Sequence, residues 1–234
     1  SLLRRDRDRA YDHMTKHTID ALDSLAGSSS AIAIDENFTH YFVDAIRAVS
    51  VEDDRLQSFL ESIQELLSLM VGIRALPEGA AHDDDRILAT LRLMEYLKHG
   101  GRTDSYIRYV HRIVDLQLKL GHHTEAANIL MLANGVIGWS DRVIGPTDAT
   151  SSFQWERQPE RDRKELVLNT AAELYIQGSQ YEKAIETYEI IKQHFLTQQF
   201  IYHKVAAALE AQAKLYRRIV EDEDRPNMFP TFYR

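Results

Sequence analysis

Cysteine is absent from the 234 residues of this chain, so the chain can form no disulfide, hold no thiolate-bound metal and use no cysteine nucleophile. Long hydrophobic runs are absent too, because no apolar stretch approaches the roughly 20 residues that span a membrane. The first residues, SLLRRDRDR, also lack the apolar core of a signal peptide. These absences predict a cytoplasmic protein without a transmembrane segment.

Positive charge is in short supply. The chain has 28 Lys and Arg residues against 36 Asp and Glu residues, which gives a formal net charge of −8. Nucleic-acid binding relies on clustered basic side chains that displace counterions from phosphates. We therefore expect no nucleic-acid partner.

Proline is scarce and confined to boundaries. Its five copies all fall between segments with helical apolar periodicity. Since proline inside a helix costs about 3 kcal/mol, this placement is the one expected when every element is a helix. No segment shows convincing strand alternation. We predict an all-α fold, an antiparallel array of about eight or nine helices over residues 5–25, 37–49, 51–76, 84–98, 104–120, 124–139, 160–177, 181–196 and 200–221.

The stretch 103–141 is typical of a helical hairpin. Its first half repeats apolar residues at helical spacing, and Gly121 can adopt the left-handed conformation that ends a helix. In the second half, Ala126 and Ala127 fall where a neighbouring helix must come close. Helical hairpins with small residues at the contact are a tetratricopeptide-like arrangement.

A weak internal repeat extends this pattern. Gly178 precedes Ala184 by six residues, as Gly121 precedes Ala127, and both glycines are predicted to end a helix. The segment 140–161 between the two hairpins is rich in turn-forming residues and is predicted to be a long surface loop. We expect the hairpins to form one domain.

Few residue patterns point to chemistry. His13 and His17 lie one helical turn apart, a spacing that zinc could use, but a catalytic zinc site needs a third ligand and a general base. A rival interpretation as a helical metalloenzyme rests on this pair alone. The sequence has no phosphate-binding loop, no GxGxxG motif and no GxSxG elbow. We therefore predict that the chain is not an enzyme and has no catalytic, cofactor-binding or metal-binding residue.

Short segments of the C-terminal part carry a resemblance to a known family. In chain order they are YIRY (106–109), DL (115–116), TEAA (124–127), WSD (139–141, beginning at Trp139), RKEL (163–166), Gly178, YEKAI (181–185), QAKLY (212–216), Arg225-Pro226 and FYR (232–234). In order and spacing they resemble the helical first lobe, lobe A, of the DOCKER domain in DOCK-family guanine nucleotide exchange factors. The resemblance covers about residues 84–234.

The resemblance implies a lobe that supports two later lobes, which grip a small GTPase of the Rho/Rac type. Those lobes would be absent here, since the chain ends where the family's second lobe begins. The chain also begins without Met, as an excised piece would. Residues 1–80 would be N-terminal helices, 84–222 the helical-hairpin array and 223–234 a linker to the second lobe. The implied function is that of a scaffold and dimerisation lobe. For the parent protein, the resemblance implies an ELMO-type partner and recruitment to membranes from the cytoplasm.

The late helices carry more aromatic surface than one helical pair needs to bury. We predict that Phe195, Phe200, Tyr202 and Tyr216 form a dimer or lobe interface. A rival interpretation is a stand-alone tetratricopeptide-like adaptor that binds a peptide or protein partner in a concave groove. That alternative predicts regular repeats and a groove rich in asparagine and basic residues.

Overall fold

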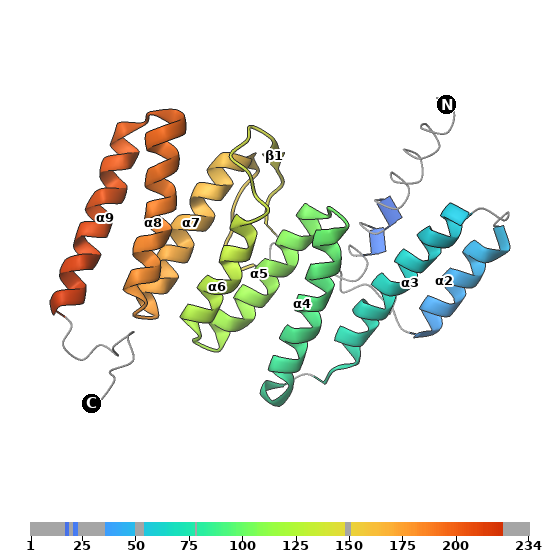
Figure 1. Cartoon of the computed structure of the whole chain (residues 1–234). Helices are drawn as coiled ribbons and strands as arrows, with labels where there is room; N and C mark the ends of the chain where they lie inside the picture. Colours follow the sequence, from blue (N-terminus) through green and yellow to red (C-terminus); the bar gives the residue numbers. More distant parts are fainter. Residues whose placement is uncertain are drawn as a thin grey trace, which may run out of the picture. The chain divides into compact units, whose positions relative to one another are not determined.

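The computed structural model describes residues 17–18, 21–22, 36–49, 54–77, 79–147 and 151–221 (Figure 1). These residues are almost entirely helical, which confirms the predicted all-α array. The α-helices are α2 (Glu36–Val49), α3 (Asp54–Ala75), α4 (Asp83–His99), α5 (Thr103–Lys119), α6 (His123–Asn134), α7 (Glu160–Gln177), α8 (Tyr181–His194) and α9 (Tyr202–Glu221). A short 3-10 helix, η1 (Ala80–His82), precedes α4. His13 and the predicted linker 223–234 lie outside the described residues, and His17 is exposed.

The chain divides into two compact units, Ser1–Tyr109 and Val110–Arg234, with the boundary inside α5. In the first unit, α2 packs against α3 and α3 packs against α4. The Tyr96 hydroxyl of α4 donates to the Ser62 carbonyl of α3 at 2.6 Å. The core of this unit includes Phe59, Leu60, Ile63, Leu66, Leu67, Met70, Leu93, Met94 and Leu97. The prediction of a single lobe concerns how the two units combine, and it stays a prediction.

In the second unit, consecutive helices pack side by side: α6 against α7, α7 against α8, and α8 against α9 (Figure 1). Ala126, Ala127 and Ala184, which we expected at close helix contacts, are fully buried. Leu130 and Leu168 of the same unit are fully buried as well. Small side chains at these positions let the helix axes approach, and the leucines fill the remaining space.

The turns after α4, α5 and α7 share one geometry. Gly101, Gly121 and Ser179 adopt left-handed φ angles of 67°, 76° and 57°. In each turn the amide of the following residue donates to the carbonyl five residues before it, at 2.8, 2.9 and 2.7 Å. This is the Schellman ending of a helix, and the next helix begins two residues after the left-handed position each time.

This geometry shifts the predicted repeat by one residue. Gly121 ends α5 as expected, but its counterpart after α7 is Ser179 and not Gly178, whose φ of −82° any residue can adopt. Counted from the left-handed residue, Ala184 therefore corresponds to Ala126 and not, as predicted, to Ala127. The prediction failed here because a glycine next to a turn does not show which of two neighbours takes the left-handed conformation.

Gly178 has a steric role. A Cβ at this position would overlap Thr124 Oγ1 and would lie 3.1 Å from the backbone N of Thr124, at the start of α6. The Thr124 hydroxyl also reaches the Gly178 carbonyl at 3.5 Å. The glycine therefore allows the end of α7 to lie directly against the start of α6.

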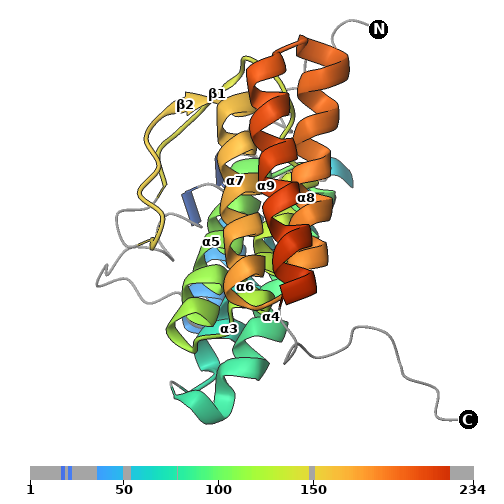
Figure 2. The ribbon, with the colours of Figure 1, turned by 90° about the vertical axis from the view of Figure 1, so that its left-hand side faces the viewer.

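The described part of segment 140–161 is not a free surface loop, as we had expected, but is folded against the second unit. Two short strands, β1 (Val143–Ile144) and β2 (Gln158–Pro159), pair antiparallel and run beside α7 (Figure 2). The Arg163 side chain of α7 is 1% exposed and donates to two carbonyls of the segment, at 3.0 and 2.8 Å. Strands of two residues are too short to show alternation, and nothing in the sequence distinguishes Arg163 from an arginine on a helix surface.

Two helix ends differ from the prediction. α6 ends at Asn134 and not at residue 139, because the chain turns at Gly135. α8 passes into a single turn of π-helix, η2 (Phe195–Gln199), and Phe200 and Ile201 separate this turn from α9. Both irregular ends lie near the same side of α7, and they shape the site described next.

Candidate functional site

α9 presents apolar side chains on two faces. The inner face, which packs against α8, is formed by the apolar side chains of Val205, Ala208 and Leu215 and by one buried polar side chain, Gln212. The outer face consists of six exposed residues spaced alternately four and three apart: Tyr202, Ala206, Leu209, Ala213, Tyr216 and Val220. Leu209, Tyr216 and Val220 are 48, 58 and 82% exposed. This spacing is typical of a helix that packs against another helix, and no helix in the described part of the chain covers it.

The inner face of α9 is fixed to α8 by polar contacts. Gln212 Nε2 donates to the Ile185 carbonyl at 3.0 Å and to Glu189 Oε2 at 3.1 Å. Hydrogen bonds from Lys192, Gln193 and Gln212 lower the pKa of Glu189 to about 2, so its carboxylate is charged at neutral pH. The rotation of α9 about its axis is thereby set, and the outer face is turned away from α8.

The predicted interface residues fall into two groups. Phe195 is 2% exposed and belongs to the core, where it clusters with Leu168, Ile191 and Val205. Phe200, Tyr202 and Tyr216 are exposed, at 63, 67 and 58%. The interface itself stays a prediction, and Phe195 is too deeply buried to contribute to it. The sequence did not single out Leu209 and Val220, because helical spacing alone does not separate an exposed apolar side chain from a buried one.

The connection from α8 to α9 is strained. Phe200 has a φ of 54°, and a non-glycine residue in this left-handed region costs about 1–3 kcal/mol. The Ile201 amide donates to the Phe195 carbonyl at 3.0 Å, which closes the π-helical turn and holds Phe200 in place. π-Helical turns and strained residues occur frequently at functional sites.

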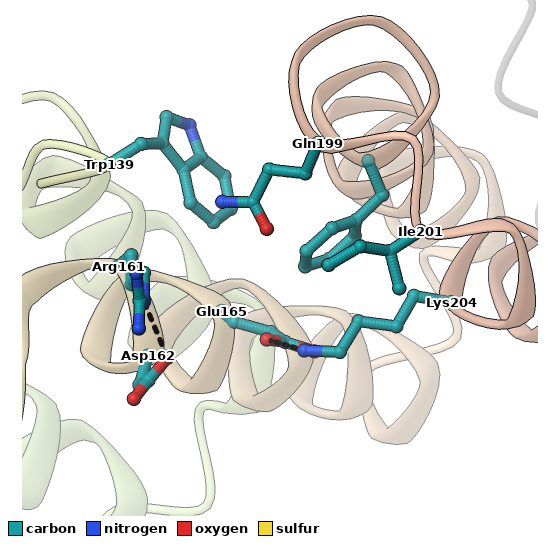
Figure 3. Close-up of a pocket in the computed structure, with 8 residues that line it drawn as sticks. Trp139, Arg161, Asp162, Glu165, Gln199, Ile201 and Lys204 are labelled. Atoms are coloured by element: carbon teal, nitrogen blue, oxygen red, sulfur yellow. Dashed lines mark hydrogen bonds and ion pairs between the residues drawn. The ribbon is translucent and has the colours of Figure 1, made fainter.

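A pocket of about 310 Å³ lies beside this connection (Figure 3). Its apolar wall is formed by Trp139, Phe195 and Ile201. Its polar side comes from the first turns of α7, the end of η2 and the first turn of α9, and consists of Arg161, Asp162, Glu165, Gln199 and Lys204. Figure 3 shows the Gln199 amide extending toward the Trp139 ring, with the ion pairs on the opposite side of the opening.

The charged groups of the pocket are paired with one another. Lys204 Nζ donates to Glu165 Oε2 at 2.6 Å, and the same ammonium lies 4.5 Å from the centroid of the Phe195 ring. Arg161 pairs with Asp162 at 3.5 Å and with Asp141. The pocket therefore presents ion pairs that satisfy each other, next to an aromatic wall.

Trp139 is held rigidly in this wall. Its ring stacks on His194, with centroids 3.7 Å apart and planes 6° from parallel. Lys164 Nζ donates to the carbonyls of Asn134 and Ile137, at 2.9 and 2.7 Å, and fixes the segment that leads from α6 to Trp139. The sequence singled out this tryptophan as a motif residue but did not indicate what it contacts.

The histidine beneath Trp139 favours its neutral form. Burial and the nearby Lys164 ammonium lower the pKa of His194, and the Glu165 carboxylate opposes this effect. Within the described residues, His194 Nε2 has no hydrogen-bond partner that could stabilise a charge. The stacked pair therefore contributes an apolar surface and no cation at neutral pH.

Among the residues that the structure describes, no three His, Asp or Glu side chains are placed to hold a metal ion. None of the described helices is long and apolar enough to cross a membrane. The predicted absence of catalytic and cofactor-binding residues stays a prediction.

Comparison with known proteins identifies relatives that match most of the chain. No family model matches it. Dedicator of cytokinesis protein 4 from Homo sapiens is 26% identical over 221 residues, which make up 92% of this chain and 11% of that protein. Dedicator of cytokinesis protein 4 from Mus musculus is 26% identical over 178 residues, or 76% of this chain and 8% of that protein. Dedicator of cytokinesis protein 3 from Mus musculus is 24% identical over 178 residues, with the same coverage.

The chain spans about a tenth of the length of the curated relatives it matches. The alignments nevertheless cover 76–92% of the chain itself. The sequence matches and the all-α fold together show that the chain is related to a segment of the dedicator of cytokinesis (DOCK) family.

Proposed function

We propose that the chain is the helical first lobe of the DOCKER domain in a DOCK-type guanine nucleotide exchange factor, and that it serves there as scaffold and dimerisation lobe. In this proposal the parent protein acts on a small GTPase of the Rho/Rac family, with an ELMO-type partner, in the cytoplasm and at membranes. The exchange activity belongs to other parts of the parent. The similarity to dedicator of cytokinesis proteins 3 and 4 supports the family.

The observation that supports self-association is the outer face of α9. All six of its residues are apolar and exposed, whereas a monomer normally buries such a continuous stripe. The exposed residues beside the stripe carry both signs of charge, including Glu210, Lys214 and Arg217. When two copies of α9 pair antiparallel about a twofold axis, the stripes meet and flanking charges of opposite sign can face each other.

The tetratricopeptide-like adaptor remains the second candidate, and one observation favours it. The turns at Gly101, Gly121 and Ser179 repeat the same hydrogen-bond pattern, as successive hairpins of a repeat protein would. The spacing of these turns is irregular, however, because the segment 140–161 intervenes between the second and the third. We therefore retain the scaffold and dimerisation lobe as the main proposal.

Two adjacent alanines of α9 give a matched test. Ala206 lies on the outer face, whereas Ala207 is exposed on the polar side of the same helix. We expect the wild-type chain and Ala207→Glu to form dimers in light scattering over a concentration series. We expect Ala206→Glu to be monomeric, because a dimer would bring two new carboxylates into an apolar contact. Circular dichroism should show equal helix content in all three proteins.

Either of two results would contradict the proposal. A wild-type chain that keeps the monomer mass at the highest concentration would remove self-association as a property of this chain. A dimer that survives in Ala206→Glu would show that the contact lies elsewhere than on the outer face of α9.

A further inference from the structure

We propose that the pocket between Trp139 and Lys204 is a docking site for a partner protein, which inserts one bulky uncharged apolar side chain from a short segment. This function is distinct from self-association through the outer face of α9. The proposal rests on the shape of the pocket, the strain beside it and the balance of its charges.

The shape fits one large side chain. A volume of about 310 Å³ lies at the low end of the range for ligand pockets. The pocket therefore fits one large side chain better than a bulky cofactor. Trp139 and Phe195 supply aromatic surface, and Ile201 closes the wall between α9 and η2. The Trp139 ring is held by its stack on His194, so the wall exists before a partner arrives.

The strained backbone at Phe200 lies beside the same pocket. Gln199 and Ile201 line the pocket, and Phe200 between them is the residue held at a φ of 54°. The π-helical turn Phe195–Gln199 contributes both ends of its five residues to the pocket. Backbone outliers of this kind cluster at functional sites.

The charges decide the chemistry of the occupant. Lys204 and Arg161 are each paired with a carboxylate, so the two cations and the two anions that line the pocket cancel. A charged side chain entering here would have to displace an existing ion pair and lose its own hydration. An aromatic or branched aliphatic side chain brings no charge that must be desolvated and gains contact with the apolar wall, and the Gln199 amide can bond to the backbone that carries it or to an indole N–H.

The first experiment uses small probes and the two tryptophans of the chain. Nitrogen-15 spectra show one indole signal for Trp139 and one for Trp155, which lies outside the pocket and serves as an internal control. We expect N-acetyl-L-tryptophanamide to shift the Trp139 signal until saturation and to leave Trp155 unchanged. N-acetyl-L-argininamide should shift neither. Saturable shifts with the arginine probe, or equal shifts of both tryptophans, would overturn the proposal.

The second experiment selects segments from a random-peptide library on the wild-type chain. Gln199 and Gln198 are neighbours of the same type, but only Gln199 lines the pocket, and Gln198 is exposed. We expect the selected peptides to share one bulky apolar residue. Their affinity should fall at least about tenfold for Gln199→Trp, which fills the pocket, and stay within about twofold for Gln198→Trp.

Three outcomes of the selection would overturn the proposal. They are peptides without a shared apolar residue, peptides with a shared Arg or Lys, and binding that survives in Gln199→Trp. The selection is repeated in Ala206→Glu, which separates the two proposals. Peptides that bind Ala206→Glu as well as the wild type support a docking site independent of self-association. Peptides that bind Ala206→Glu but not the wild type would show that a second copy fills the pocket.

Discussion

Replacing Gly178 with alanine tests how closely α7 approaches α6. The φ of Gly178 is −82°, which alanine adopts without strain, so the reduced freedom of the unfolded chain would by itself stabilise the variant by about 0.4–1 kcal/mol. The new Cβ would, however, overlap the hydroxyl of Thr124, and overpacking of this kind costs about 1–3 kcal/mol. We expect Gly178→Ala to lower the free energy of unfolding by about 0.5–2 kcal/mol.

Two further substitutions, made alone or together with Gly178→Ala, separate the causes. Gly135 also ends a helix with an ordinary φ of −71°, and the nearest atom to a Cβ there is a carbonyl at 3.4 Å. Gly135→Ala should therefore be neutral or stabilising by up to about 1 kcal/mol. Thr124→Ala removes the overlapping hydroxyl, so Gly178→Ala should cost less in that background, with a coupling energy of about 0.5–2 kcal/mol.

Urea denaturation followed by circular dichroism at helical wavelengths measures the wild type and the four variants, including the double variant Thr124→Ala/Gly178→Ala. The reasoning fails when Gly178→Ala stabilises the chain as much as Gly135→Ala does. It also fails when the effect of Gly178→Ala is the same with and without the Thr124 hydroxyl, because the contact between the two helices would then not be what requires the glycine.

Leu130→Ala should lower the free energy of unfolding by about 2–5 kcal/mol through a cavity, and Ala184→Leu should lower it by about 1–3 kcal/mol through overpacking, since both residues are fully buried. Unchanged denaturation midpoints in both would show that these faces are not packed. Burial and Lys164 lower the pKa of His194 from 6.5, so its stabilising contribution is complete above that pH and is lost as pH falls through the folded pKa. The denaturation midpoint of the wild type and of the exposed-site variant His203→Gln should thus fall more on acidification than that of His194→Gln, and equal slopes would refute this. The isolated chain should not accelerate release of a fluorescent guanine nucleotide from Rac or Rho, and clear acceleration would place exchange residues within it.

The sequence by itself determined most of the helices and the resemblance to the DOCK family. Apolar residues at helical spacing, bounded by proline and glycine, are local signals, and the helix predicted over 160–177 agrees with α7 at both ends. The order and spacing of short segments such as YIRY and TEAA indicate the resemblance to the DOCK family, and the similarity to dedicator of cytokinesis protein 4 agrees with it. The left-handed residue after α5 was also predictable, because Gly121 stands alone at that turn.

Only the tertiary structure decided which faces are covered. Phe195 lies near the end of one predicted helix and Phe200 at the start of the next, yet the first is buried and the second is exposed. Arg163 looks like a surface residue in the sequence, but it is turned inward to bind carbonyls of the segment 140–161 that precedes its helix. Spacing along a helix shows that certain side chains share a face, whereas burial of that face depends on the helix packed against it. The pocket and the outer face of α9 both follow from such long-range packing, and for that reason neither could be derived from the sequence.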